Sequence, residues 1–366
     1  MLSKQENDPS LIKTSVPPYL TMVTPSRNDD YGGGMVPRLQ FSLDILFEQL
    51  EKYKIESELI LVDYNPPQDR KSLKDALRFP RKSEYISVRI LEVPLRFHKR
   101  WLYYQHSPIH RSQAMNVGLS RARGQFSVVR MSDIIWSEEL LSFIGSKNLE
   151  KNTKYRCTRC DVDRAIMNYP NWPVSRNLDY CKANTTTRMV KMKYYVKGLP
   201  ALLLNSDGDF QLLSTENFMW LRGYWETEVM NSPNVDGLLE FCAFAAGVKD
   251  NLLKDVYIYK IEHDEAYKRR VLLTIPFFDK LGRFIPTSFF GPFFIKAARI
   301  LGLTRIFYDK RMMKIRGIPQ PTRSEYYDMC KKIIDHEISY VLNGPDWGLS
   351  DERIEEYVIL KAAWDV

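Results

Sequence analysis

Cysteine is scarce in this chain, and long apolar runs are absent from it. Five cysteines in 366 residues are too few for a disulfide-stabilised scaffold. The most apolar stretch, 284–303, is interrupted by Pro286, Pro292 and Lys296, so no transmembrane helix is expected. Residues 1–17 form a polar leader without the apolar core of a signal peptide, and no internal repeat occurs. These absences predict a protein of the reducing cytoplasm.

The composition is that of a globular protein with an uneven charge distribution. Hydrophobic residues make up 44% and charged residues 27%, which excludes a disordered or fibrous chain. The net charge is +8, and the stretch 268–316 holds 12 Lys and Arg against 2 Asp, beside several phenylalanines. Such a stretch is suited to an anionic membrane surface. The alternative is a helical subdomain with a phenylalanine core and solvated cations. No nucleic-acid motif accompanies the charge, so no nucleic-acid partner is expected.

Apolar strand patterns alternate with amphipathic helix patterns in the first 150 residues. This order predicts an α/β fold, with a Rossmann-like, mostly parallel sheet flanked by helices. The expected strands are 19–27, 57–67, 86–94 and 126–133. The expected helices are one around Leu39–Leu50, a short one near 70–79, 110–124 closed by Gly124, and 138–145 begun by Ser137.

The second half is less regular, but it continues the same architecture. We expect strands at 155–164, 206–214 and 256–264, and helices at 216–226, 235–247 and 324–342. The predicted organisation is an α/β domain over 18–265, followed by a basic, aromatic and mainly helical region over 266–366.

Ligands of such sheets bind beyond the carboxyl ends of the strands. That rule selects Thr24–Asp30, Asp63–Asn65 and Ser132–Asp133. All three ranges contain carboxylates, and the first leads into a polar, glycine-rich loop. A polar, acidic pocket at this place fits a nucleotide with a bound divalent metal, which few carboxylates and the phosphate oxygens hold together.

Five segments occur in an order that resembles a known enzyme family. They are ELILVDYNPP (58–67), AMNVGLSRARGQFSVVRMSD (114–133), SDGDFQLLS (206–214), ENFMWLRGYWE (216–226) and IEHD (261–264). Together they resemble the GT-A fold nucleotide-sugar glycosyltransferases, close to the inverting family 2. The resemblance covers roughly residues 19–265 and implies the GT-A form of the α/β fold.

On the donor side, the resemblance assigns roles to three residues. Asp63 falls at the strand end that contacts the nucleoside base in the family. Asn116 is retained from the family's Ala-Arg-Asn triplet, whose Arg is Met115 here. Asp133 matches the second Asp of the D-x-D signature, and Met131 stands at the first.

On the acceptor side, the resemblance assigns Gly208 and Asp209 to the acceptor loop and Glu226 to the family's GG[FY]-x-E turn. Asp236 falls on the second position of the Glu-Asp pair, whose Asp is the general base, while Val235 stands at the Glu position.

The chemistry of sugar transfer explains these residue types. The leaving nucleoside diphosphate develops charge that a divalent ion, Mn²⁺ or Mg²⁺, commonly neutralises. Asp133 and the late histidine, His263, are the expected metal ligands. Further donor contacts are expected from polar residues at the strand ends: Thr24, Ser26, Arg27 and Ser132.

The sequence therefore predicts an inverting, metal-assisted glycosyltransferase of polysaccharide or glycoconjugate synthesis. It would move a sugar from a nucleoside-diphosphate donor to a hydroxyl of a glycan or lipid-linked acceptor, in the cytoplasm or on the cytosolic face of a membrane. Three alternatives stay open: a retaining GT-A enzyme, a catalytically silent sugar-nucleotide or glycan-binding protein, and a nucleotidyltransferase. The loop RNDDYGGG (27–34) counts against the last, because it is acidic where a phosphate loop is usually basic.

Each candidate residue also has a structural alternative. The carboxylates can cap strand ends or a helix, or fix loops, and the histidine can be an ordinary loop residue: Asp63, Asp133, Asp236, Asp209, Glu226 and His263. A zinc site at Cys157, Cys160 and Cys181 is disfavoured, because the first two point to opposite faces of a strand and no fourth ligand follows.

Overall fold

The structure, a computed structural model, describes residues 17–189, 193–194, 198–203, 209–228, 234–263, 321 and 323–365. Two of the expectations above fall outside these residues. They are the acceptor-loop residue Gly208 and the basic stretch 268–316.

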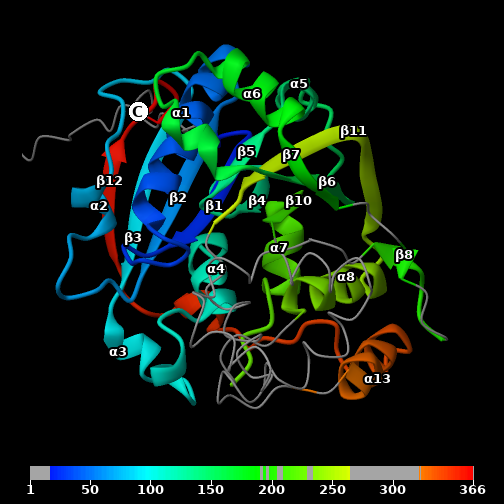
Figure 1. Cartoon of the computed structure of the whole chain (residues 1–366). Helices are drawn as coiled ribbons and strands as arrows, with labels where there is room; N and C mark the ends of the chain where they lie inside the picture. Colours follow the sequence, from blue (N-terminus) through cyan, green and yellow to red (C-terminus); the bar gives the residue numbers. More distant parts are fainter. Residues whose placement is uncertain are drawn as a thin grey trace, which may run out of the picture.

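The described strands and helices follow the expected order (Figure 1). The strands are β1 (Leu20–Ser26), β2 (Ser57–Tyr64), β3 (Ile86–Val93), β4 (Phe126–Arg130), β5 (Ile134–Trp136), β6 (Thr153–Val162), β7 (Thr185–Met189), β8 (Lys193–Tyr194), β9 (Leu202–Leu203), β10 (Phe210–Ser214), β11 (Lys249–Ile261) and β12 (Glu355–Leu360). The α-helices are α1 (Met35–Lys52), α2 (Leu73–Ala76), α3 (Leu95–His98), α4 (Arg111–Leu119), α5 (Glu138–Gly145), α6 (Val174–Ala183), α7 (Thr215–Leu221), α8 (Val235–Ala245) and α13 (Arg323–Ile334). Short 3₁₀ helices are η2 (Tyr104–His106), η3 (Arg164–Asn168) and η5 (Trp347–Leu349).

A single large sheet runs through the described part of the chain. Its strand order is β12-β3-β2-β1-β4-β10-β6-β11-β5, and β7 also pairs with β6. The four strands β3, β2, β1 and β4 are mutually parallel, as are β6 and β11, and the other pairs are antiparallel. The predicted α/β class with a parallel core is confirmed, and the second half of the chain adds antiparallel strands to it.

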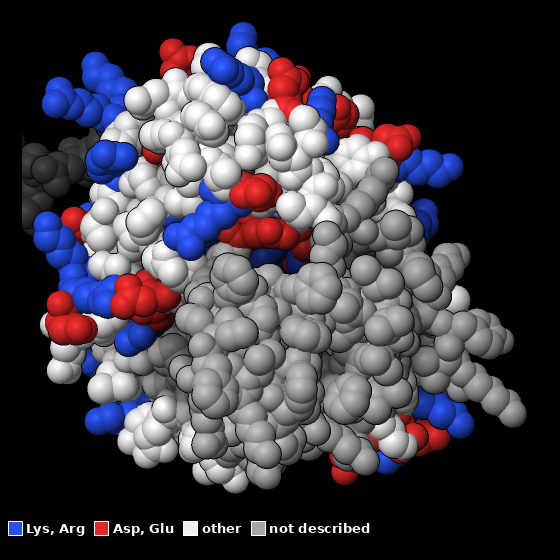
Figure 2. All heavy atoms as spheres, viewed as in Figure 1, with Lys and Arg blue, Asp and Glu red and all other residues white. Residues whose placement is uncertain are grey.

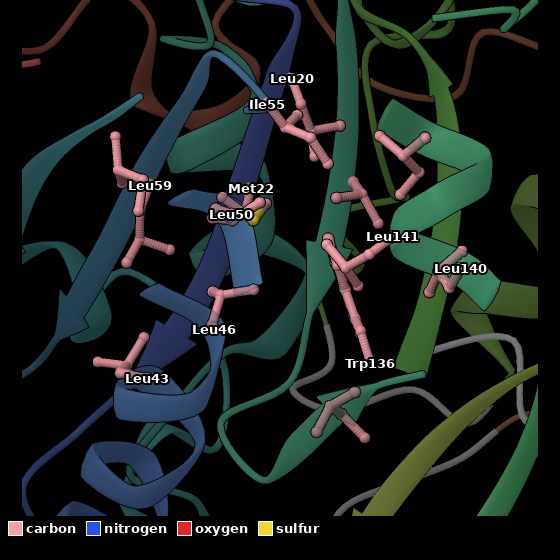
Figure 3. Close-up of a cluster of buried hydrophobic side chains, with 14 of the residues drawn as sticks. Leu20, Met22, Leu43, Leu46, Leu50, Ile55, Leu59, Trp136, Leu140 and Leu141 are labelled. Atoms are coloured by element: carbon pink, nitrogen blue, oxygen red, sulfur yellow. The ribbon is translucent and has the colours of Figure 1, made fainter. Parts of the chain in front are cut away.

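Helices cover both faces of the parallel core because its strands are apolar on both faces. Leu59 and Leu61 of β2 pack into one cluster with α1 and α5, whereas Ile60 and Val62 pack into a second cluster with α4, α7 and α8. Figure 3 shows the first cluster, in which leucines of α1 and α5 point toward Trp136 and the strands. This unbroken apolar character of β2 is typical of buried parallel strands.

The C-terminal residues 323–365 are built into the same body. Helix α13 packs beside α8, as Figure 1 shows in orange, through the second apolar cluster. Strand β12 then adds antiparallel to the free edge of β3. This part of the predicted mainly helical region thus supplies an edge strand to the sheet as well as a helix.

Some expected helix ends are wrong. Helix α13 ends at Ile334, well before the expected residue 342. Helix α4 ends at Leu119, before Gly124, and Gly124 has no positive φ angle. A Cβ at Gly124 would lie 2.6 Å from the backbone nitrogen of Thr21, so this glycine permits close packing against β1. Ser137, in contrast, is confirmed as the cap of α5, since its hydroxyl accepts from the Leu140 amide.

Among the described helices, none combines the length and the hydropathy that crossing a membrane requires.

Candidate functional site

Polar residues at the carboxyl ends of β1 and β2 lie side by side. Ser26 and Asp63 are paired in the parallel register. Asp63 is fully buried, and its Oδ2 accepts a hydrogen bond from the Leu73 amide at 2.7 Å. Its Oδ1 has no hydrogen-bond partner among the described residues. Burial raises the pKa of Asp63 to about 7, because the ionised form loses its hydration.

The predicted donor-side residues of β1 continue toward the loop after β4. The hydroxyl of Ser132 lies 3.3 Å from that of Ser26 and so joins the two strand ends. The buried hydroxyl of Thr24 has no hydrogen-bond partner within the described ranges. Arg27 turns toward the end of β2, where its Nε donates to the carbonyl oxygen of Asn65 at 2.6 Å.

Asp133 and His263, the two predicted metal ligands, lie together. Oδ2 of Asp133 is 3.6 Å from Nε2 of His263. They are 130 positions apart in the sequence, and the sheet brings them together. The Ile261 amide at the end of β11 donates to the carbonyl oxygen of Asp133 at 2.9 Å.

The glycine loop 31–34 closes over this pair. Gly32 has a φ angle of +64°, and a Cβ there would lie 2.8 Å from the imidazole of His263 and 2.9 Å from Nη2 of Arg38. The ring of Tyr31 lies 5.2 Å from the His263 ring. Only glycine leaves room for both neighbours in this backbone conformation.

A network of charged residues extends the site across β6 and β11, and the sequence analysis selected only Asp209 among its members. Asp209 accepts hydrogen bonds from Arg159 and, at 3.0 Å, from Nζ of Lys260. Arg159 also pairs with Asp161 at 2.7 Å. Burial raises the pKa of Asp209, but Lys260 and Arg159 outweigh burial and hold this pKa well below its usual range. Acidic and basic side chains gather in the middle of the face in Figure 2, beside the grey atoms.

Two further buried cations act on Asp133. Arg38 is fully buried and donates to three carbonyl oxygens of the 31–34 loop. Arg130 is also fully buried, and its Nε and Nη1 have no hydrogen-bond partner in the described part of the chain. Burial lowers the pKa of Arg130 to about 10, while the carboxylate of Asp133 opposes that shift. Asp133 therefore lies in a strongly cationic surrounding.

The structure offers two protein ligands of the kind that a divalent ion needs. A carboxylate oxygen and an imidazole nitrogen 3.6 Å apart suit adjacent positions around one ion, at about 2.1 Å from each. Within the described ranges, no group of three or more His, Cys, Asp or Glu residues is placed to hold a metal. Met131, at the first D-x-D position, packs against the apolar clusters instead. The residues present fit an ion that takes its remaining ligands from a bound phosphate group.

The predicted donor residue Asn116 and the predicted acceptor residue Glu226 contact each other. Nδ2 of Asn116 donates to Oε1 of Glu226 at 2.8 Å, and its Oδ1 accepts from the Tyr224 amide. The same Glu226 oxygen accepts from the Gly348 amide at 2.8 Å. Burial raises the pKa of Glu226, although Asn116 and Gly348 counteract that effect. These three elements, α4, the turn after α7 and the C-terminal segment, form one unit.

Asp236 lies in the first turn of α8, as expected, and its backbone carbonyl group contacts β10. Nε2 of Gln211 donates to the carbonyl oxygen of Asp236 at 3.2 Å and to Oε1 of Glu240 at 2.6 Å. Burial raises the pKa of Tyr326 on α13, and the charge of Asp236 adds to this shift. Tyr326, Val235 and Glu226 line a cavity of about 560 Å³ beside this helix end.

The zinc alternative finds no support in the described residues. Cys157 packs in the first apolar cluster, whereas Cys160 and Cys181 pack in a third, separate cluster. All three side chains are buried. They therefore serve as core residues.

Comparison with known proteins gives structural matches only. No family model and no curated protein matches the sequence. Among solved structures, TarS from S. aureus in complex with UDP aligns at 16% identity and a TM-score of 0.42, covering 70% of this chain and 64% of that one. The mannosyltransferase PcManGT from Pyrobaculum calidifontis, in complex with GDP-Man and Mn²⁺, aligns at 14% identity and a TM-score of 0.41, covering 74% and 65%. GalNAc-T7 with UDP, GalNAc and Mn²⁺ aligns at 11% identity and a TM-score of 0.41, covering 68% and 44%.

The chain thus spans less than two thirds of each of these proteins. Matches of this kind assign no residue and no substrate, so any function must be inferred from the site itself.

Proposed function

We propose that this protein is a nucleoside-diphosphate-sugar glycosyltransferase. It transfers the sugar to a hydroxyl of a glycan or lipid-linked acceptor, with inversion, in polysaccharide or glycoconjugate synthesis. The observation that supports this most directly is the meeting of Asp133 and His263 at the carboxyl edge of the sheet, 3.6 Å apart. This edge is where α/β sheets bind nucleotides.

The donor side supplies polar atoms that a nucleoside would satisfy. Oδ1 of Asp63 and Oγ1 of Thr24 are buried without partners among the described residues. Buried polar atoms normally have hydrogen-bond partners, so such atoms at a strand end suggest a ligand. The ionised carboxylate of Asp63 would accept a hydrogen bond from an N–H group of the base.

The diphosphate lies next to Asp133 and His263 in this proposal. A divalent ion, Mn²⁺ or Mg²⁺, would stabilise the negative charge that develops as the sugar bond breaks. Asp133, just beyond β4, and His263, just beyond β11, would hold this ion, and Gly32 leaves space for the imidazole.

The acceptor side lies toward α8. Asp236 accepts the proton of the attacking hydroxyl, and its place in the first turn of α8 favours the ionised carboxylate. Asp209 and Glu226 are hydrogen-bonded to other residues of the protein, so in this proposal they shape the acceptor side. Asp209 does so through Arg159 and Lys260, and Glu226 through the turn after α7. Contact of the stretch 268–316 with an anionic membrane surface belongs to the same proposal.

A second candidate is a silent sugar-nucleotide-binding protein. Three family polar positions hold apolar residues here, and these have core packing: Met115 and Val235 are buried, and Met131 packs against two clusters. Apolar replacements at polar family positions are expected in a protein that has lost catalysis.

Turnover separates the two candidates. A panel of nucleotide sugars, with and without Mn²⁺, should raise the melting temperature for one donor, because a ligand of the native state stabilises it. The same donor should be hydrolysed slowly or transferred to an acceptor, and NMR of the product should show an inverted anomeric centre. Donor binding without any turnover would favour the silent protein. A retained configuration would favour a retaining enzyme, and no shift with any donor would refute both candidates.

A further inference from the structure

Lys260 interacts with both Asp209 and Asp133, two carboxylates of the candidate site. It lies on β11 between β5 and β6, paired with Ile134 on one side and Asp161 on the other. Its Nζ donates to Oδ1 of Asp209 at 3.0 Å. The residue that follows it, Ile261, is hydrogen-bonded to the backbone of Asp133. Lys260 is therefore held between the carboxylate of Asp209 and the loop that bears the metal ligand.

The charges around these two carboxylates do not leave an acidic site. The carboxylates here are Asp133, Asp209, Asp161 and Asp29. They are outnumbered by the cations that pair with them or act on them, which include Lys260, Arg159, Arg38, Arg130 and Arg27. A divalent ion entering alone would meet an excess of positive charge. A diphosphate would instead be attracted, and would bring the charge and the oxygen ligands that the ion lacks.

We propose that Lys260 couples the two ligands, so that this site takes up a divalent ion only together with a diphosphate. Lys260 neutralises the carboxylates while the site is empty and faces the phosphate oxygens when the site is filled. The inference depends on the proposed function for the identity of the diphosphate, but the coupling itself is a property of these charges. By linkage, the diphosphate raises the affinity for the ion by the same factor as the ion raises the affinity for the diphosphate.

The test uses the full chain with Mn²⁺ and inorganic pyrophosphate as probes. Calorimetry measures the affinity for Mn²⁺ alone, and thermal unfolding compares Mn²⁺, pyrophosphate and their mixture. The variants are Lys260→Met, which removes the charge, and Lys260→Arg, which keeps it. Lys254→Met is the matched control, because Lys254 lies on the same strand but is exposed. Lys260→Gln replaces the methionine variant if that variant does not fold.

The wild type, Lys260→Arg and Lys254→Met should bind Mn²⁺ weakly alone and give a large stabilisation only with the mixture. Lys260→Met should gain at least about tenfold in affinity for Mn²⁺ alone, since it loses the repulsion of a nearby unit charge. Its pyrophosphate affinity should fall. Tight binding of Mn²⁺ alone to the wild type would overturn the proposal, and so would a Lys260→Met variant that behaves like the wild type.

These outcomes are separate from those of the proposed function. A protein that shows the coupling but neither binds nor turns over any nucleotide sugar would keep the coupling and lose the glycosyltransferase proposal. A protein that transfers sugar but binds Mn²⁺ tightly without a diphosphate would refute the coupling and leave the glycosyltransferase proposal intact.

Discussion

Asp63 at the end of β2 and Asp133 just beyond β4 lie on either side of the end of β1, yet their surroundings differ. No cation of the described residues is hydrogen-bonded to Asp63, and burial raises its pKa to about 7. Asp133 faces His263 and a group of buried cations. The two carboxylates are thus suited to different ligands. Asp63 is suited to a neutral hydrogen-bond donor, whereas Asp133 is suited to charged ligands such as a metal ion with a diphosphate.

The pKa of Asp63 predicts a pH effect on stability. In the folded state this group binds its proton up to about pH 7, whereas in the unfolded state it releases it near pH 4, so its ionisation destabilises the fold as the pH rises through this window. Asp63→Asn keeps the acceptor for the Leu73 amide and removes the ionisation. Relative to the wild type, the variant should gain stability between pH 5 and pH 8, by roughly 1.4 kcal/mol for each unit of pKa difference that is crossed.

Urea unfolding at pH 5, 6.5 and 8 measures this difference. Asp328→Asn, at an exposed position of α13, is the control and should show no such trend. A constant difference between Asp63→Asn and the wild type across the three pH values would contradict the prediction.

In the proposed mechanism, Asp236 is the general base on the acceptor side. Asp236→Asn should lower the rate of transfer by at least about 100-fold, since a positioned general base contributes on that scale. Donor binding should be unchanged, because the substitution preserves shape and lies on the acceptor side. The rate is measured with the donor found in the panel, and binding by thermal shift. Unchanged turnover would remove Asp236 from the mechanism.

At the scale of the elements, the glycine loop 31–34 connects α1 with the end of β11. The sequence indicates a turn there, but only the folded chain shows that Gly32 abuts His263 and Arg38. The loop therefore sets the position of the imidazole as well as the start of the helix.

Gly32→Ala tests this contact. The added methyl group should displace the imidazole and lower the apparent affinity for Mn²⁺ with pyrophosphate at least about tenfold. Separately, the unliganded variant should lose about 1 kcal/mol of stability, because alanine is disfavoured in the left-handed backbone conformation. Gly247→Ala is the matched control, because its φ angle is +79° and nothing lies within 4 Å of the added atom. Equal ligand stabilisation in both variants would show that Gly32 does not position His263.

At the scale of the whole molecule, the C-terminal segment packs on the turn that bears Glu226, which belongs to the proposed acceptor side. Gly348 donates its amide to Glu226, and a Cβ there would lie 2.4 Å from the carbonyl oxygen of Asn116. Beyond it, β12 closes the edge of the sheet on β3. Residues near the end of the chain thus hold a turn that lies more than a hundred positions earlier.

Gly348→Ala should therefore lose more stability than Gly247→Ala. Both variants introduce a side chain at a positive φ angle, but only the first meets the backbone of α4. We expect an additional loss of about 1–3 kcal/mol, the usual cost of overpacking, and a lower rate of transfer. Urea unfolding of the two variants measures this difference in unfolding free energy. Equal losses would show that the C-terminal segment shifts to accommodate the added methyl group without loss of stability.

The sequence by itself determined the strands and helices of the parallel core and the edge of the sheet at which the candidate residues lie, but it did not predict β5, α6, β7 or β12. Strands such as β2 are apolar throughout, α1 has a clear helical period, and Ser137 is a good helix cap, so local chemistry was sufficient for these. The end of α4 was mispredicted because Gly124 serves a close approach to β1, which local rules do not show.

Only the tertiary structure decided which charged groups share the site. Lys260 resembles an ordinary polar residue at a strand end, and its sequence neighbours reveal nothing of Asp133 or Asp209. Its role arises because non-sequential strands pair side by side, and because burial removes the water that would otherwise screen these charges.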